Sequence, residues 1–248
     1  MLERVLERLS VSEFKSHFIL KGGMLITSMI GIAARSTMDM DTTVKGYTLS
    51  MNEVTSIFEK IISIKIDDNV ELSLLGIEEI HELADYPGYR LSIRAILEKT
   101  RQIIKVDITT GDEITPKEIE YFYPLMLEDR SIGIMAYNLE TILAEKFETC
   151  ISLGVFNSRM RDFYDIYIMT SICIYDSEVF KAALYKTMNN RGTIAQLADA
   201  QSIISSFEKD KNMMDLWGRY RSKNSYAEEV TWNDVIDALY KLCAKAYD

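Results

Sequence analysis

Two aspartates one residue apart follow a pair of glycines in this chain. Asp39 and Asp41 stand in the run MDMDTTV, and Gly22-Gly23 precede the apolar run MLITSMIGIAA. If residues 38–44 form a strand, both carboxylates point to one face of it, because side chains alternate along a strand. Two carboxylates on one face can hold Mg²⁺. Glycines before a helix let a phosphate approach the backbone N–H groups at the helix N-terminus. The pattern predicts a magnesium-dependent phosphate site.

Each half of this pattern also has a simpler explanation. Aspartates with one residue between them are common on solvated loops and strand edges, and a glycine pair often makes only a turn. The two halves in this order and at this spacing favour the chemical interpretation over both simpler ones.

A third carboxylate is expected from a neighbouring strand. Residues 101–110 read RQIIKVDITT, a β-branched run with Asp107 between Val106 and Ile108. A carboxylate in such a strand either points to solvent or lines a pocket. With two aspartates already assigned to one site, we interpret Asp107 as the third metal ligand. The competing carboxylates at this stage are Asp67, Asp68, Asp85 and Asp112.

Two later segments offer charged side chains for the same chemistry. Lys146 lies on a helix that Asn138 is expected to cap; its alternative role is that of a surface cation. In RMRDFYD, Asp162 and Asp165 are three residues apart and share one helix face, so they could orient Lys146 by charge-assisted hydrogen bonds. Their alternative role is to stabilise the helix, because negative charge in the first turn interacts favourably with the helix dipole.

The coarse pattern predicts an α+β protein with a mixed α/β domain over residues 1–137 and an all-helical domain over residues 138–248. Apolar periodicity and turn residues divide the chain into expected elements. Helices are expected over 2–16, from the glycine pair to about 31, over 50–62, from 138 to 154, and over 160–172, 176–189, 194–208 and 231–246; strands or extended runs are expected over 38–44, 70–76, 88–98, 101–110, 121–127 and 131–137, with a turn at 101–102.

Composition excludes several classes of site. The chain has 3 cysteines, widely separated, and 2 histidines, which argue against a disulfide framework, a zinc site and imidazole-based hydrolysis. The first residues, MLERVLERLS, form an amphipathic helix rather than a signal peptide, and the longest apolar run is too short to span a membrane. We therefore expect a cytoplasmic protein that makes no membrane contact.

The net charge of −10 disfavours general nucleic-acid binding, so an RNA substrate would need a local basic patch. The candidate segments are Arg159 with Arg161, and Lys209 to Lys223, which reads KDKNMMDLWGRYRSK. Aromatic and basic side chains together suit backbone pairing and base stacking. The alternative is a solvated helix end with buried aromatic rings.

The chain resembles the AbiEii/AbiGii group of nucleotidyltransferase-like toxins, a branch of the DNA-polymerase-β-type nucleotidyltransferase superfamily. The resemblance covers about residues 20–165. Four motifs carry it: Leu20-Lys21-Gly22-Gly23 with Arg35-Ser-Thr-Met-Asp39-Met-Asp41, then Lys105-Val-Asp107-Ile, Asn138-Leu-Glu140-Thr-Ile-Leu-Ala-Glu145-Lys146, and Arg159-Met-Arg161-Asp162-Phe-Tyr-Asp165. The chain has Gly22-Gly23 where many relatives have Gly-Ser, and Arg161 where the family often has lysine.

The resemblance implies a Mg²⁺-dependent enzyme that transfers a nucleotide from an NTP and releases pyrophosphate. It implies a polymerase-β-like catalytic domain and roles for the motif residues. Metal binding falls to Asp39, Asp41 and Asp107; catalysis to these three with Lys146 and Asp162; and nucleotide binding to Lys21, Gly22, Gly23, Arg35, Thr37, Arg161 and Asp165.

The resemblance further implies the toxin of a toxin–antitoxin or phage-defence pair, with a separate antitoxin partner. The acceptor hydroxyl we favour is that of a tRNA 3′ end, and a protein hydroxyl is an alternative. Two other functions stay open. One is a catalytically inactive nucleotidyltransferase fold that binds nucleotide, RNA or a protein partner; the other is an interaction scaffold whose helical half binds a partner.

Overall fold

The computed structural model describes residues 1–31, 33, 35, 37–45, 50–80 and 88–247. The chain forms two compact units. Unit 1 comprises Met1–Met29, Ser36–Asp112 and Glu118–Tyr137, and unit 2 comprises Ile30–Arg35, Glu113–Lys117 and Asn138–Asp248. The main division falls at the residue where the sequence pattern changes, but two short segments inside the first 137 residues belong to unit 2.

Unit 1 is built on one mixed sheet of seven strands in the order β3-β4-β5-β2-β1-β7-β6. The pairs β1–β7 and β2–β5 are parallel, and the other neighbours are antiparallel. The strands are β1 (Phe18–Lys21), β2 (Asp39–Val44), β3 (Val70–Ile80), β4 (Gly88–Leu97), β5 (Thr100–Thr110), β6 (Ile119–Pro124) and β7 (Ser131–Ala136).

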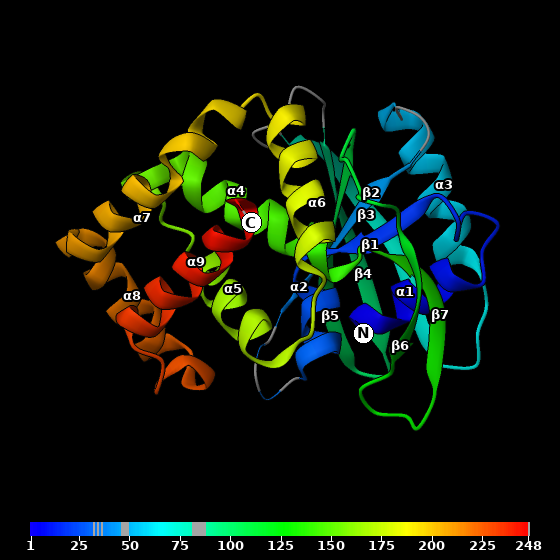
Figure 1. Cartoon of the computed structure of the whole chain (residues 1–248). Helices are drawn as coiled ribbons and strands as arrows, with labels where there is room; N and C mark the ends of the chain where they lie inside the picture. Colours follow the sequence, from blue (N-terminus) through cyan, green and yellow to red (C-terminus); the bar gives the residue numbers. More distant parts are fainter. Residues whose placement is uncertain (32, 34, 36, 46–49, 81–87, 248) are drawn as a thin grey trace. The chain divides into compact units, whose positions relative to one another are not determined.

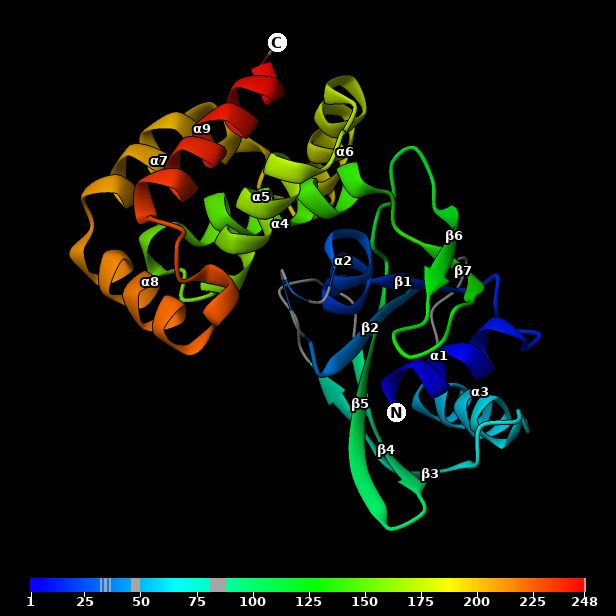
Figure 2. The same cartoon turned by 90° about the horizontal axis from the view of Figure 1, so that it is seen from below.

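Three helices accompany this sheet: α1 (Leu2–Ser10), α2 (Gly22–Ile30) and α3 (Met51–Ser63). Helices α1 and α3 lie side by side, α3 against β3 and α1 against β7 (Figures 1 and 2). Phe18 of β1 and Phe58 of α3 meet edge to face at 5.4 Å between ring centroids, which joins helix and sheet in one core. Ser50 caps α3 in a capping box with Glu53.

Unit 2 is helical, and Figure 2 shows its main helices packed around α4 and α9. Its core is rich in aromatic rings; Phe163, for example, contacts both Phe207 and Trp232. The elements are α4 (Leu139–Leu153), η2 (Gly154–Phe156), α5 (Met160–Ile172), α6 (Ser177–Asn190), η3 (Ile194–Asp199), α7 (Ala200–Lys209), α8 (Lys211–Lys223), η4 (Ser225–Ala227) and α9 (Trp232–Tyr247). Asn138 caps α4 as expected, by accepting from the backbone N–H of Thr141.

Several elements differ from the sequence-based expectation. No strand was expected where β1 lies, and the helix expected over 194–208 begins as the 3₁₀ helix η3. Helix α1 ends at Ser10 rather than near residue 16. At this end, the hydroxyls of Ser10 and Ser12 donate to backbone carbonyls of the last turn of the helix. The β4–β5 turn falls at residues 98–99 rather than 101–102, with Glu98 at φ +52°. Helix α8 was not predicted, because only Met213 and Trp217 of its thirteen residues are buried and the segment is mostly polar.

Across the described ranges, no helix is both long enough and apolar enough to span a membrane.

Candidate functional site

The junction of β1 and α2 places the glycine pair beside Asp41. Gly22 has φ +66°, a left-handed conformation that favours glycine, and it starts α2. The backbone N–H of Gly23 donates to Asp41 Oδ2 at 3.2 Å. One of the N–H groups expected to meet a phosphate therefore binds an aspartate of the predicted metal site.

The three predicted metal ligands share one face of the sheet. Asp39 and Asp41 lie two residues apart on β2, and Asp107 of β5 is the parallel register partner of Asp41. Residues paired in register point to the same side, so the three carboxylates line up on neighbouring strands. Asp39 is exposed, Asp41 is half-buried and Asp107 is 7% exposed.

Asp107 is held by a cation that sequence reasoning did not identify. Arg90 of β4 is its antiparallel register partner and donates twice, from Nε to Oδ1 at 2.7 Å and from Nη2 to Oδ2 at 2.6 Å. These hydrogen bonds raise the pKa of Arg90, and the charge of Asp39 adds to the effect. No sequence motif signals Arg90, because its place opposite Asp107 follows only from strand register.

The donor chemistry of this face fits a magnesium ion, with one condition. Oxygen ligands from carboxylates are those that Mg²⁺ prefers. Within the described residues, however, no three acidic, histidine or cysteine side chains lie close enough together to hold a metal. Asp39 and Asp41 can supply the first ligands, whereas Asp107 can join them only when Arg90 releases it.

Lys21, expected to bind nucleotide, has a carboxylate partner within unit 1. Its Nζ lies 2.7 Å from Oδ2 of Asp112, which also accepts from Thr109, and it lies 5.8 Å from the centre of the Tyr137 ring. Burial alone would raise the pKa of Asp112, but Lys21 and the hydroxyl donors lower it to about 2. Lys21 and Asp112 thus form a buried ion pair at the end of β1.

The other competing carboxylates have different surroundings. Asp68 accepts two hydrogen bonds from the buried Arg8, which links α1 to the start of β3. Asp67 lies in the loop before β3, and Asp85 lies outside the described residues. Of the described candidates for the third carboxylate, Asp107 is the one that pairs in register with Asp41.

A second charged cluster lies within unit 2. Lys146 Nζ lies 2.6 Å from Asp162 Oδ1 and 2.8 Å from Asp165 Oδ2, so the contact expected between this lysine and the carboxylate pair is present. Arg35 donates to the same Asp165, from Nε to Oδ1 at 2.6 Å and from Nη2 to Oδ2 at 3.1 Å. Two cations and two carboxylates neutralise each other.

Burial makes the charges of this cluster interdependent. Arg35 is 2% exposed and Asp165 is fully buried. Burial would raise the pKa of Asp165, but Lys146 and Arg35 hold it below its usual value. Burial would lower the pKa of Lys146, but Asp162 and Asp165 raise it instead. These contacts join the four side chains within unit 2. The predicted roles of Arg35, Lys146, Asp162 and Asp165 in nucleotide binding and catalysis stay predictions.

The last two predicted nucleotide contacts, Thr37 and Arg161, are accessible. The Thr37 hydroxyl lies 3.4 Å from the carbonyl oxygen of Asp39, where it supports the start of β2. Arg161 is exposed in the first turn of α5 and lines a surface hollow there.

Comparison with known proteins agrees with this fold and these motifs. A profile of the family described as nucleotidyl transferase AbiEii toxin, Type IV toxin–antitoxin system, matches residues 4–238. The chain belongs to the AbiEii family of nucleotidyl transferase toxins. Membership in this family implies a cognate antitoxin. No curated protein sequence matches the chain.

Two solved structures show that the AbiEii chain shares a nucleotidyltransferase-like fold. One is a protein from H. pylori to which a nucleotidyltransferase function has been attributed, with a TM-score of 0.50 and 15% identity over 99% of this chain and 89% of that one. The other is JHP933 from Helicobacter pylori, with the same TM-score and identity over 99% and 87% of the two chains. At this identity the likeness concerns the fold alone.

Proposed function

We propose that this AbiEii protein is a Mg²⁺-dependent nucleotidyltransferase that transfers NMP from an NTP to an acceptor hydroxyl. The observation that carries the proposal is the alignment of Asp39 and Asp41 with Asp107 on one sheet face, beside the glycine pair that starts α2. A metal ion bound there would supply positive charge to the phosphates and lower the pKa of the attacking hydroxyl.

The residues of unit 1 have separate tasks in this proposal. Asp39 and Asp41 would hold the metal, and the N-terminus of α2 would attract the negative phosphates. The acceptor oxygen forms a bond to the α-phosphorus, the bond from that phosphorus to the bridging oxygen breaks, and pyrophosphate leaves. Asp107 helps to take the proton of the acceptor once Arg90 has released it. Catalysis then rests on positioning and charge stabilisation.

The acceptor we favour is the 3′ end of a tRNA, and the biological role is that of the toxin in a toxin–antitoxin or phage-defence pair. Membership in a family of Type IV toxins supports this role. Transfer to a protein hydroxyl is the alternative chemistry of the same site.

Incubation with Mg²⁺, each α-labelled NTP and total tRNA tests the proposal. We expect wild-type protein to label RNA and the variant Asp39→Asn/Asp41→Asn to lose the label. Asp129→Asn/Asp237→Asn is the matched control, because both residues are exposed and the charge change is the same. Label on protein instead of RNA would show that the acceptor is a protein hydroxyl and not the 3′ end of a tRNA. Absence of any label, with nucleotide bound, would contradict transfer.

A second candidate function is a catalytically inactive fold that binds nucleotide, RNA or a protein partner. The bidentate pair of Arg90 and Asp107 favours it, since an arginine neutralises the third carboxylate. This function predicts nucleotide binding without pyrophosphate release at any Mg²⁺ concentration, so pyrophosphate measured in the same reactions separates the two candidates.

A further inference from the structure

A basic hollow lies within unit 2, where the start of α5 meets the end of α8. Its volume is about 360 Å³, and four cations line it: Arg159, Arg161, Arg219 and Lys223. Tyr220 contributes a half-buried ring to the same wall. The two helices pack against each other, so residues 60 positions apart in the sequence form one surface.

The charge of this basic hollow is not balanced by described carboxylates. None of its four cations makes an ion pair with any of them; Arg219 Nε donates to the backbone carbonyl of Asp215 at 3.3 Å, which leaves its charge in place. The whole chain carries a net charge of −10. Four neighbouring positive side chains on an acidic protein repel one another unless an anion joins them.

The start of α5 adds little to this positive potential. Arg159 is the N-cap residue of this thirteen-residue helix, and Asp162 places a carboxylate in its first turn. The backbone N–H groups of Met160 and Asp162 already donate to the carbonyl oxygens of Ser158 and Arg159. The four side-chain cations, rather than the helix end, therefore carry the positive charge of the basic hollow.

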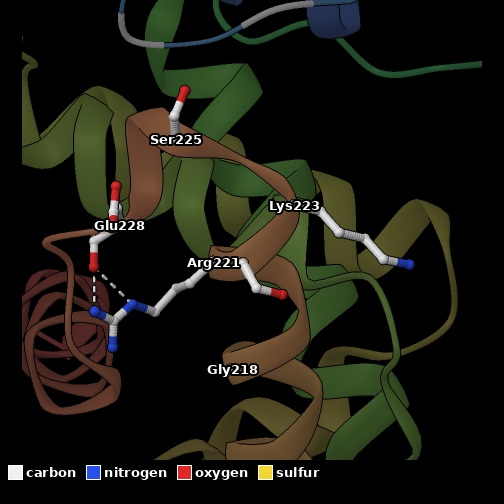
Figure 3. A pocket seen from close by; sticks show the side chains of 6 residues that line it. Gly218, Arg221, Lys223, Ser225 and Glu228 are labelled. Carbon is white, nitrogen blue, oxygen red and sulfur yellow. Dashed lines mark hydrogen bonds between the residues drawn. The ribbon is translucent and has the colours of Figure 1, made fainter.

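A second hollow of about 500 Å³ on the other side of Lys223 is less suited to an anion. Figure 3 shows Arg221 reaching the backbone carbonyl of Glu228 with both donors, while Lys223 points away from it. Glu228 also lines this second hollow, so its charge is mixed. Lys223 borders both hollows, whereas Arg159, Arg161 and Arg219 line only the basic hollow.

We propose that the basic hollow binds the phosphate backbone of an RNA strand. Three of its four cations are arginines, whose planar donors match phosphate oxygens in pairs. An aromatic ring among basic side chains is the usual composition of a single-strand binding surface, which favours RNA over an acidic peptide. Four cations spread over two helices also exceed what one phosphate requires. This inference deepens the proposed function, because it locates where an RNA acceptor is held.

Trp217, in contrast, cannot stack on a base. It is 2% exposed, its indole donates to the carbonyl of Val230, and its ring packs against Tyr220 and Trp232. The expectation of buried aromatic rings in this segment therefore holds for Trp217, while the cations around it remain accessible.

Fluorescence anisotropy of a labelled single-stranded RNA, at low salt and without NTP, tests the proposal on the full chain. We expect Arg219→Glu/Lys223→Glu to weaken binding about tenfold or more and to reduce the slope of log affinity against log salt by about 1.4, at about 0.7 per lost contact. Lys209→Glu/Lys211→Glu is the matched control, because these exposed lysines make the same charge change outside the basic hollow. We expect this control to bind nearly as well as wild type.

Three results would overturn the proposal. The wild type could fail to bind RNA, both double variants could lose equal RNA affinity, or the wild type could bind inorganic pyrophosphate or polyglutamate but not RNA. Thermal melting of both variants guards against misfolding. Asp39→Asn/Asp41→Asn separates the inference from the proposed function, since it should bind RNA normally while it abolishes transfer.

Discussion

The carboxylate of Asp41 occupies the space that a side chain at position 22 would need. A Cβ atom on Gly22 would lie 2.6 Å from Asp41 Cγ and 2.8 Å from its Cβ, closer than real atoms approach. Gly22 is also left-handed, with φ +66°. Glycine at this position therefore serves the predicted metal ligand as well as the turn.

We expect Gly22→Ala to reduce nucleotidyl transfer about a hundredfold, because Asp41 must move and a displacement of about 1 Å can cost that much. Gly31→Ala is the matched control: Gly31 also has positive φ, but nothing lies within 4 Å of its Cβ position. Backbone strain should cost both variants about 1 kcal/mol of stability, the collision with Asp41 should add to the loss in Gly22→Ala, and only Gly22→Ala should lose activity. Equal activities would show that Asp41 has no catalytic part.

Arg90→Gln should increase the affinity for Mg²⁺ or Mn²⁺ several-fold, because it leaves Asp107 without its bidentate partner and free to bind metal. Manganese binding measured by electron paramagnetic resonance would show the change. Arg94→Gln on the same strand is the control, since Arg94 donates to Ser73 and not to a carboxylate. Unchanged affinity in Arg90→Gln would remove Asp107 from the set of metal ligands.

Lys146→Met should destabilise the protein by about 3–5 kcal/mol, the usual cost of removing one partner from a buried ion pair. Among the described contacts, the variant leaves Asp165 paired with Arg35 and removes Lys146, the cation partner of Asp162. Because the pKa of Asp165 is lowered in the folded protein, its charged form stabilises the fold above about pH 4, and this contribution is lost as the pH falls. The difference in unfolding free energy between Lys146→Met and wild type should therefore become smaller in acid.

Urea unfolding at several pH values measures this effect. The exposed Lys186→Met is the control and should change stability little. A loss in Lys146→Met no larger than in this control would show that the cluster does not stabilise unit 2.

Asp112 should make the folded state acid-sensitive in a defined range. Its folded pKa of about 2 lies below the ordinary aspartate value of 3.8, so it stabilises the fold above about pH 4 and this contribution disappears as pH falls toward 2. The shift corresponds to about 2 kcal/mol at neutral pH. Unfolding of Asp112→Asn should therefore depend less on pH between about 4 and 2 than that of wild type, whereas the exposed Asp129→Asn should follow wild type.

The sequence predicted the parts of this protein that depend on local pattern. The strand that carries Asp39 and Asp41 and the helix capped by Asn138 follow from alternation and capping, and the structure has both. The α+β class and its helical second half follow from the same patterns. Helix α8 was not predicted because only two of its thirteen side chains are buried and most of the others are polar.

Partners that depend on long-range register could not be predicted. Arg90 meets Asp107 because β4 and β5 pair in one particular register, and Arg35 meets Asp165 across 130 positions of sequence. The resemblance to the family gave Lys21 and Arg35 nucleotide-binding roles. It could not show that Asp112 and Asp165 are their carboxylate neighbours.

The division of the chain has a practical consequence for fragments. Unit 2 includes Ile30–Arg35 and Glu113–Lys117, both encoded upstream of residue 138. A single cut at residue 138 would remove Arg35 from Asp165 and would also remove Thr115, whose backbone carbonyl accepts from the side chains of Asn138 and Thr141. Residues 138–248 alone therefore do not encode a complete unit 2, so truncation, domain exchange and split-protein designs must carry these two segments along with the helices they complete.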